Sequence, residues 1–372
     1  MKILYGVVGE GMGHATRSRV ILEALSVKNE VLVVASGRAY DFLSARFPNV
    51  HKIWGYTLAY EQNAVKRLKG NVTGAIESIR DVSDEEMTKA ALQNARGAAA
   101  GVPENVRQYF EISEKFSPDC VVSDFETFAY LYGRNWMLPV ISIDNMQIIN
   151  RCVHDPSIIE GFEADFQLAK GIVKSKLPGC FHYLVSTFFY PPLRKPRTTL
   201  LPPILRPEIL QAKPEAGEHL LVYQTSTSNT ELPQILKRSK LPCRIYGLRR
   251  DLDEDLRDEN LLYRPFSEQG FIDDLRTARA VIANGGFTLM SEAVYLHKPM
   301  LALPVGGQFE QVLNARYLEE EGFGLYAPAL TNEALERFLP MVARCSDKLA
   351  GYRQDGNRAL LAKLDELLEQ VA

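Results

Sequence analysis

The chain is organised around residues 279–325, which read RAVIANGGFTLMSEAVYLHKPMLALPVGGQFEQVLNARYLEEEGFGL. A short β-branched run, 280–283, leads into a pair of glycines, Gly285 and Gly286, and apolar residues then recur at helical spacing. This pattern predicts a strand, a glycine turn and a helix. Glycines suit a tight turn with positive φ and leave the backbone bare enough for a ligand to approach closely. The helix start, near Thr288, points free N–H groups and a partial positive charge outward, which favours phosphate binding.

A second unit repeats this pattern directly downstream. Residues 299–304 read as another buried strand, the next two glycines as its turn, and residues 308–321 as a helix that opens with Glu310 and Gln311. Carboxylate and amide side chains are hydrogen-bonding groups of the kind that hold sugar hydroxyls. One turn therefore offers donors for phosphate, and the next offers groups for a sugar.

The two units together resemble the nucleotide-sugar signature of GT-B glycosyltransferases. The resemblance is to the family-1, UDP-glucuronosyltransferase-like enzymes and to the lipid-linked GlcNAc transferase of peptidoglycan synthesis, and within these to a bacterial and archaeal group of uncharacterised transferases. Their signature runs glycine pair, Ser or Thr, Glu on the helix, Pro, then an acid-Gln or Gln-Gln pair followed by Asn-Ala. The matching positions here are Gly285, Gly286, Thr288, Glu292, Pro304, Glu310, Gln311, Asn314 and Ala315.

This resemblance implies a role for each matching position. The implied roles are ribose binding by Glu292, diphosphate binding by Gly285, Gly286 and Thr288, and binding of the transferred sugar by Glu310 and Gln311. Two positions depart from the family pattern. Asn284 stands where many family-1 members carry a His that contacts the diphosphate, and Glu310 stands where an Asp is commoner. The identity of the sugar is therefore left open.

Length and composition indicate a globular protein of two domains. The chain has 372 residues, which is too many for a typical single core. A hydrophobic content of 46% with 24% charged residues is typical of folded proteins and excludes disorder. The formal net charge of −3 gives no basic footprint, so nucleic acid is not an expected partner.

The sequence predicts a cytoplasmic protein. The first residues carry one lysine and only a short apolar run, which is no secretory signal, and no apolar stretch is long enough to span a bilayer. Residues 160–176 form an amphipathic segment with several lysines that could contact the inner face of the membrane peripherally, although packing on its own domain is the favoured alternative. Scattered cysteines in no C-x-x-C spacing read as buried thiols of a reducing compartment: Cys120, Cys152, Cys180, Cys243 and Cys345.

The N-terminal half alternates strand and helix. Residues 2–8 and 30–35 read as buried strands and residues 14–25 as the helix between them, which predicts an α/β fold with a parallel sheet. With the resemblance, the expected fold is GT-B, two Rossmann-like doubly wound domains facing a cleft. The predicted divisions are an N-terminal acceptor-binding domain, a proline-rich linker too broken for a packed element, a C-terminal nucleotide-sugar-binding domain and a last helix that packs back on the first domain: 1–190, 191–212, 213–354 and 355–372.

The glycine turn after the first strand also invites a dinucleotide-binding interpretation. The G-x-G-x-x-G fingerprint would need a third glycine where this chain has His14. The second predicted strand ends in Ser-Gly-Arg instead of the acid that holds an adenosine ribose. Arg38 could tolerate a 2′-phosphate, so an NADP-dependent oxidoreductase stays open as the weaker alternative.

His14 is a candidate catalytic base. It lies at the predicted start of a helix, where the dipole disfavours the imidazolium and leaves the ring able to accept a proton. From position alone, a histidine that packs under the glycine turn explains it equally well. The resemblance favours the base, because related GT-B enzymes carry a Gly-His pair in this turn and Gly13-His14 matches it, with Arg17 one turn further along.

Asp124 and Asp144 fall at the ends of two predicted strands, 118–124 and 139–144, at the edge where ligands bind in open α/β sheets. The resemblance favours Asp124 as the partner that orients His14. A role for Asp124 as the N-cap of the helix that follows is the alternative, and Asp144 is the fallback partner.

The C-terminal half offers further donor contacts by resemblance. Thr225 and Ser226 follow a predicted strand and are plausible contacts to the diphosphate or sugar, although helix capping explains them nearly as well. Residues 264–267, with Phe266, lie where the family receives the nucleotide base. Asp251 and Asp253 imitate a D-x-D metal motif, but they belong to a run of mixed charge that favours a solvated surface. We expect no essential metal and no bound cofactor besides the donor.

The predicted function is a metal-independent, inverting hexosyltransferase that uses a nucleotide sugar, in the first place a UDP-hexose, and an acceptor hydroxyl. The acceptor is left open among lipids, glycans and small molecules, as is the base of the nucleotide between uracil, thymine and guanine. Two alternatives share the expected site: a non-hydrolysing UDP-sugar 2-epimerase and a non-catalytic nucleotide-sugar-binding protein.

Overall fold

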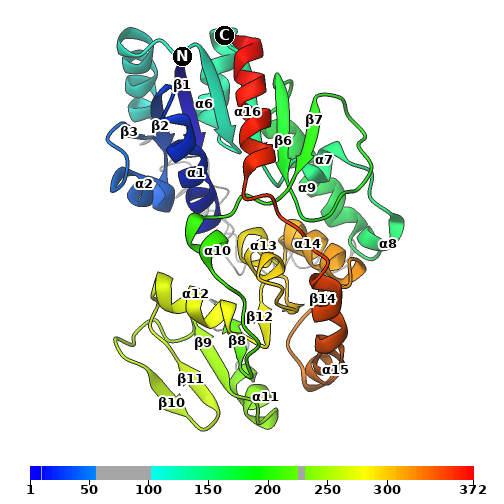
Figure 1. Ribbon diagram of the computed structural model, residues 1–372. Coiled ribbons are helices and arrows are strands. Elements are labelled where there is room, and N and C mark those ends of the chain that lie inside the picture. Colours follow the sequence, from blue (N-terminus) through cyan, green and yellow to red (C-terminus); the bar gives the residue numbers. More distant parts are fainter. Residues whose placement is uncertain (10, 56–101, 225–230) are drawn as a thin grey trace, which may run out of the picture.

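The computed structural model describes residues 1–9, 11–55, 102–224 and 231–372, and these form two lobes, one above the other in Figure 1. Each lobe is built on a seven-stranded sheet with helices packed against it. The expected alternation of strands and helices is confirmed in both lobes. Every neighbouring pair of strands is parallel except one at the edge of the second sheet.

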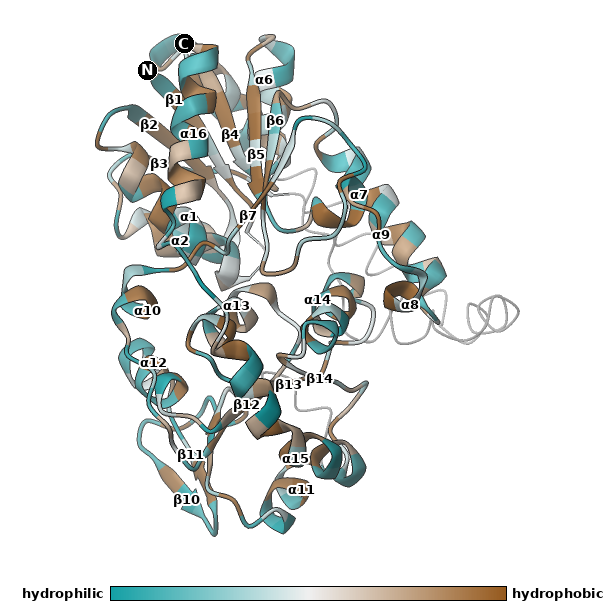
Figure 2. Ribbon diagram, turned by 45° about the vertical axis from the view of Figure 1, so that its right-hand side comes forward, coloured by the Kyte–Doolittle hydropathy of each residue, from teal (hydrophilic) through white to brown (hydrophobic). Residues whose placement is uncertain are grey.

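The first sheet has the order β3-β2-β1-β4-β5-β6-β7. Its strands are β1 (Lys2–Val7), β2 (Glu30–Ala35), β3 (Val50–Lys52), β4 (Cys120–Asp124), β5 (Val140–Asp144), β6 (His182–Ser186) and β7 (Thr198–Leu201). Its helices are α1 (Met12–Leu25), α2 (Gly37–Ser44), a helix over 102–115, α6 (Thr127–Asn135), α7 (Ile148–Arg151), α8 (Pro156–Ile159) and α9 (Glu163–Lys176). Alternate residues of β1 belong to the hydrophobic cores on opposite faces of the sheet, as in a strand covered on both sides. Figure 2 shows the hydrophobic colour concentrated on the central strands β4 and β5.

The second sheet has the order β10-β11-β9-β8-β12-β13-β14. Its strands are β8 (Leu220–Tyr223), β9 (Cys243–Tyr246), β10 (Leu256–Asp258), β11 (Leu261–Tyr263), β12 (Ala280–Ala283), β13 (Met300–Ala302) and β14 (Gly324–Tyr326). The helices of this part of the chain are α10 (Pro207–Gln211), α11 (Leu232–Arg238), α12 (Glu268–Arg276), α13 (Phe287–Tyr295), α14 (Phe309–Glu320) and α15 (Asn332–Leu349), and the last helix, α16 (Arg358–Val371), returns to the first lobe. The short hairpin strand β10 is antiparallel to β11 and closes that edge.

Both sheets change winding direction at the strands that carry the predicted site. In the first sheet β1 has β2 on one side and β4 on the other, and in the second sheet β8 lies between β9 and β12. Ligands of open α/β sheets bind at such a reversal, beyond the carboxyl ends of the strands. The turn after β1 leads to His14, β4 ends at Asp124, and the turn after β12 contains Gly285. The topology therefore directs these segments to the space between the lobes.

The predicted linker, 191–212, is corrected by the structure. It contains β7 (Thr198–Leu201), which pairs in parallel with β6 and forms the last strand of the first sheet, and also α10. The prolines that suggested a linker without packed elements lie on both sides of β7 and not within it. A strand at the edge of a sheet forms backbone hydrogen bonds with one neighbour only. The four residues of β7, TTLL, contain no proline and can make these bonds with β6.

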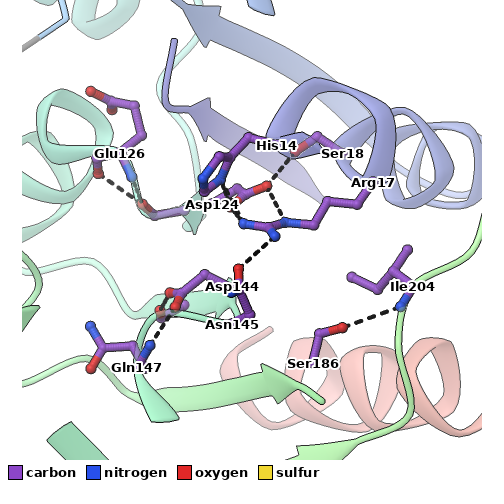
Figure 3. Close-up of polar contacts among 12 residues, drawn as sticks. His14, Arg17, Ser18, Asp124, Glu126, Asp144, Asn145, Gln147, Ser186 and Ile204 are labelled. Carbon is purple, nitrogen blue, oxygen red and sulfur yellow. Dashed lines mark hydrogen bonds and ion pairs between the residues drawn. The ribbon is translucent and has the colours of Figure 1, made fainter. Parts of the chain in front are cut away.

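The chain passes between the lobes twice, and the two passages are tied side by side. The Asn357 side chain accepts a hydrogen bond from the Leu205 N–H (2.9 Å) and donates one to the Leu205 carbonyl (2.7 Å). Just before this point the Ile204 N–H donates to Ser186 Oγ (3.2 Å) (Figure 3). After Asn357, α16 lies along the first lobe (Figure 1), and its buried leucines, Leu360, Leu364, Leu367 and Leu368, belong to the core of that lobe.

The amphipathic helix α9 packs against the protein with its aromatic face. Phe166 and Val173 are buried, and the Phe166 ring lies 5.5 Å from that of Phe309 in the second lobe, measured between centroids. Packing within the protein therefore accounts for this face, and peripheral membrane contact stays a prediction. Within the described parts of the chain, no helix combines the length and apolarity needed to cross a bilayer.

His154 joins the two lobes in its neutral form. Its Nε2 lies 3.1 Å from the Ile148 carbonyl oxygen, which can only accept, so Nε2 carries the hydrogen. Its Nδ1 then accepts from the hydroxyl of Tyr317 in α14 at 2.9 Å. Tyr317 also stacks on Phe189 with 4.0 Å between ring centroids. Protonation of Nδ1 would remove the acceptor that Tyr317 uses.

We expect the free energy of unfolding to fall as pH drops from about 6.5 to about 4. Burial lowers the pKa of His154 from 6.5 to about 4, so in this window the unfolded chain binds a proton that the folded chain does not. The loss approaches about 1.4 kcal/mol per pH unit and levels off below the folded pKa. Urea denaturation across this range measures it. The His154→Gln variant should show a shallower slope, and an unchanged slope would contradict the assignment.

Candidate active site

The turn after β1 and the end of β4 bring His14 and Asp124 into contact. His14 lies in the first turn of α1, and its Nδ1 is 2.7 Å from Asp124 Oδ1. The His14 side chain is 17% exposed and that of Asp124 only 1%. We expect Asp124 to be ionised, so its oxygen accepts and Nδ1 carries the hydrogen. His14 Nε2 is then the acceptor nitrogen, as general base chemistry requires (Figure 3).

Arg17 and Ser18 complete the partners of Asp124. Arg17 Nε donates to Oδ2 (2.9 Å) and Nη2 to Oδ1 (2.6 Å), while Ser18 Oγ donates to Oδ2 (2.9 Å). Arg17 Nη2 also lies 2.6 Å from His14 Nδ1, but both nitrogens carry hydrogens and both point them at the carboxylate. Burial raises the pKa of Asp124, yet the charges and hydrogen bonds of Arg17 and His14 outweigh it and hold that pKa below its ordinary value. Asp124 is thus a buried, compensated anion.

The two competing roles at these strand ends are excluded by the structure. The N-cap of α6 is Glu126, whose carboxylate accepts from two backbone N–H groups of the first turn, so Asp124 is not the cap. Asp144 accepts from the Gln147 N–H (2.8 Å) and from Ser142 Oγ (2.7 Å). Those bonds satisfy it within its own loop, and Asp124 is the carboxylate that contacts His14 (Figure 3).

A polar chain runs from this pair to the second lobe. Arg17 Nη1 donates to Asn145 Oδ1 at 2.8 Å, and Asn145 Nδ2 donates to Glu310 Oε1 in α14. Asn314 Nδ2, one turn along α14, lies 3.4 Å from the same oxygen. The carboxylate predicted to hold the sugar is therefore connected to the network of the predicted base. Sequence reasoning missed Asn145, although it follows directly on the strand end at Asp144.

The first glycine turn is needed for close packing, and its φ angles are ordinary. Gly285 is absent from the residues with positive φ, and Gly286, the N-cap of α13, has φ −67°. A Cβ on Gly285 would lie 2.3 Å from the Gln311 carbonyl oxygen, whereas one on Gly286 would meet nothing within 4 Å. The expectation of positive φ is wrong here, and the expectation of a bare backbone holds. Gly286 leaves open space at the start of α13.

The helix starts of the two lobes face each other across the same space. A Cβ on Gly13 would lie 2.5 Å from Thr288 Oγ1, so α1 and α13 meet at their first turns. In Figure 1, α13 and α14 lie on the side of the second lobe that faces the first. Two helix N-termini then direct partial positive charge toward the region of Gly286.

The remaining predicted donor contacts are distributed around this region. Gln311 Oε1 accepts from the Val305 N–H (3.0 Å), and its amide nitrogen donates to Gln308, so its side chain supports the second glycine turn. Asn284 is half-buried in the first turn. Phe266 is 70% exposed, with its ring 6.3 Å from that of Phe271. Contacts of these residues with a donor stay predictions.

Two further predictions concern residues away from the glycine turns. Thr225 and Ser226 lie outside the described residues. Asp251 is on the surface in an ion pair with Arg249 (2.7 Å), as expected of a solvated run, and Asp253 is exposed. Within the described ranges, 1–9, 11–55, 102–224 and 231–372, no group of three or more His, Cys, Asp or Glu side chains is arranged to hold a metal ion.

Glu292 is buried and ion-paired. It lies in α13 and is 3% exposed. Arg206, the N-cap residue of α10, donates from Nε to Oε1 (2.8 Å) and from Nη2 to Oε2 (3.0 Å), and its Nη1 binds Glu268 (2.6 Å). Burial raises the pKa of Glu292, and Arg206 opposes that rise. No sequence pattern predicts this partner, because Arg206 lies in the segment predicted to be a linker.

Comparison with known proteins decides the family. The family model described as glycosyl transferase family 1 matches residues 1–343. The chain belongs to glycosyl transferase family 1. It is therefore a glycosyltransferase, as the sequence predicted. An uncharacterized glycosyltransferase of Methanosarcina mazei is 26% identical in an alignment that covers 87% of this chain and 85% of that protein.

Solved structures confirm the GT-B fold of this glycosyltransferase. Phytolacca americana UGT2, complexed with UDP-2fluoro-glucose and pterostilbene, superposes with a TM-score of 0.66 at 13% identity, over 100% of this chain and 99% of that chain. Acinetobacter baumannii MurG superposes with a TM-score of 0.58 at 14% identity, over 98% and 99%. At such identities the likeness concerns the fold.

The two glycines of the first turn give a matched test of this geometry. We expect Gly285→Ala to destabilise the glycosyltransferase by about 1–3 kcal/mol or more, because the new Cβ collides with the backbone of Gln311. Gly286→Ala should unfold close to the parent, because its Cβ meets open space. Urea denaturation of both variants checks the difference. Equal stability of the two would show that the turns are not packed in this way.

Proposed function

We propose that this glycosyltransferase moves a hexose from a nucleotide sugar, in the first place a UDP-hexose, to an acceptor hydroxyl with inversion at the anomeric carbon. The observation that carries the proposal is the oriented His14: its Nδ1 is held by the buried, compensated Asp124, and its Nε2 is the acceptor nitrogen. Glu310 of the second lobe is connected to the same network. A base on one lobe thus lies opposite a predicted sugar-binding acid on the other.

In the proposed reaction His14 acts as general base. Nε2 takes the proton of the acceptor hydroxyl while that oxygen attacks the anomeric carbon. The new C–O bond forms as the bond to the diphosphate oxygen breaks on the opposite face, so one displacement inverts the configuration. Asp124 stabilises the imidazolium that results, and Arg17 keeps Asp124 ionised.

The leaving diphosphate gains charge at the start of α13. Backbone N–H groups of its first turn and the open space at Gly286 suit a phosphate, and the first turn of α1 lies beside it. Fixed dipoles of this kind stabilise developing charge in a site sheltered from water. This arrangement favours a reaction without an essential metal.

The choice of donor has indirect support. The structurally similar Phytolacca americana UGT2 is complexed with UDP-2fluoro-glucose. Carrying a UDP-sugar over to this chain relies on the matching positions Glu292, Glu310 and Gln311. The acceptor chemistry is set by other surfaces of the first lobe, and the proposal leaves it as a hydroxyl compound.

The donor assignment is tested by titration. We expect calorimetry in buffer with EDTA to show binding of UDP in preference to dTDP, GDP and NADPH, and Glu292→Ala to weaken it at least about 10-fold through lost charge-assisted hydrogen bonds. Binding of NADPH alone would contradict the donor assignment. A C2-epimerised sugar formed without acceptor would show a 2-epimerase instead.

The base is tested by kinetics. His14→Ala should lower kcat for transfer by about 10²- to 10⁴-fold while the affinity for UDP stays near that of the parent, because the proton acceptor is lost and the donor contacts remain. His182→Ala is the matched control, since His182 lies in β6 and bonds to Thr199 away from this network. Transfer by the His14 variant at the parent rate, with the donor bound, would refute the assignment. The configuration of the product, read by NMR, tests inversion.

A further inference from the structure

Arg206 holds the carboxylate that is predicted to bind the ribose. Its guanidinium donates to both oxygens of Glu292 and, on its remaining nitrogen, to Glu268. The side chains of Arg206 and Glu292 are 12% and 4% exposed. Such a bidentate pair, largely withdrawn from water, fixes both the charge and the orientation of the carboxylate.

The pair does not use all of the hydrogen-bond acceptor capacity of Glu292. An ionised carboxylate accepts about four hydrogen bonds, and Arg206 uses one on each oxygen. Among the described residues no other group donates to these two oxygens, so one acceptor position on each remains, and a ribose presents two neighbouring hydroxyls. We propose that Arg206 is a positioning residue of the donor site, which fixes the orientation of Glu292 and turns its free acceptor positions toward the ribose. This inference rests on the proposed function.

The burial of Glu292 makes such a partner necessary. Burial raises the pKa of Glu292, the charges of Glu268 and Glu208 add to that rise, and Arg206 opposes all three. Even with Arg206 in place the pKa of Glu292 stays above its ordinary value, so the two hydrogen bonds from Arg206 are needed to favour the ionised form, which only accepts hydrogen bonds. The charge-assisted hydrogen bonds to the ribose would be lost with the charge.

The backbone that carries Arg206 is fixed by the second passage between the lobes and by the first lobe. Its neighbour Leu205 is held at N–H and carbonyl by Asn357. Glu208, two residues after Arg206, forms an ion pair with Arg19 of α1, with 2.6 Å between Glu208 Oε2 and Arg19 Nη2. Since α1 also carries His14, a short path connects the predicted base helix, the passage between the lobes and the predicted ribose site. We therefore expect the binding of the ribose by Glu292 to depend on the relative position of the two lobes.

A double-mutant cycle tests whether Arg206 acts through Glu292. UDP is titrated calorimetrically into the full-length parent, Arg206→Met, Glu292→Gln and the double variant. We expect Arg206→Met alone to weaken UDP binding about 10- to 100-fold. In the Glu292→Gln background the same change should alter the affinity by less than about 3-fold, because the group it positions is already gone. Steady-state kinetics should show a raised donor KM with an unchanged acceptor KM.

Two further variants keep the test decisive. Arg206→Lys retains the charge without the fork and should bind UDP with intermediate affinity, which preserves the test if the Met variant fails to fold in thermal unfolding. Arg276→Met is the matched control, since Arg276 pairs with Glu215 and Asp273 in the same lobe and its loss should leave UDP affinity unchanged.

The outcomes separate this inference from the proposed function. Tighter UDP binding by Arg206→Met would overturn the inference, because Arg206 would then block Glu292. Unchanged binding, or an equal loss in the Glu292→Gln background, would overturn it as well while the parent still binds and transfers. A parent that binds no nucleotide would overturn the proposed function and this inference with it.

Discussion

The burial of the Asp124 charge is the constraint from which the active region follows. An ionised carboxylate that is 1% exposed is stable only when charge and hydrogen bonds compensate it. Three residues of one helix, His14, Arg17 and Ser18, supply all of its side-chain hydrogen bonds among the described residues. The register of α1 against β4 is fixed by that requirement. The orientation of His14 needs no separate device, because its Nδ1–H is one of the bonds that the buried anion demands.

In the second lobe, the proposed anion site depends on backbone N–H groups and not on charged side chains. A diphosphate needs N–H groups that it can approach, and side chains at the turn would occupy that space. Gly285 packs directly on the backbone of α14, which brings the two signature turns together, and Gly286 leaves the space above α13 clear. Gly13 allows α1 to meet Thr288 in the same way. Three glycines thus set the separation between the helix starts, and that separation would limit the size of the anion that the proposed site accepts.

The local sequence pattern predicted the helices and strands well. It could not predict side-chain contacts between residues that are far apart in the sequence. The strand Glu30–Ala35 has the predicted bounds, and the glycine turn between β12 and α13 lies where its spacing placed it. The contact of His14 with Asp124 followed from resemblance and from the rule for strand ends. Arg206 and Glu292 are 86 residues apart, and no periodicity links them. Asn145 was passed over for Asp144, because the strand-end rule identifies a position on the sheet edge and not the direction of a side chain. The strand β7 was not predicted, because the high proline content of residues 191–212 does not show that the prolines lie on both sides of the strand and not within it.

The two kinds of contact between the lobes differ in what they permit. Stacked rings, Phe188 on Phe287 and Phe189 on Tyr317, bury apolar surface and tolerate small sliding movements. The amide of Asn145 is more demanding, because its oxygen must face Arg17 and its nitrogen must face Glu310. In this structure the lobes are placed so that both ends of the amide are paired while Asp124 stays compensated. The apolar contacts therefore hold the lobes together, and the polar contacts determine where the predicted base and the predicted sugar-binding acid lie relative to each other. The alignment of the proposed catalytic groups in this glycosyltransferase is thus a property of the interface between the lobes, because each lobe contributes one of these groups.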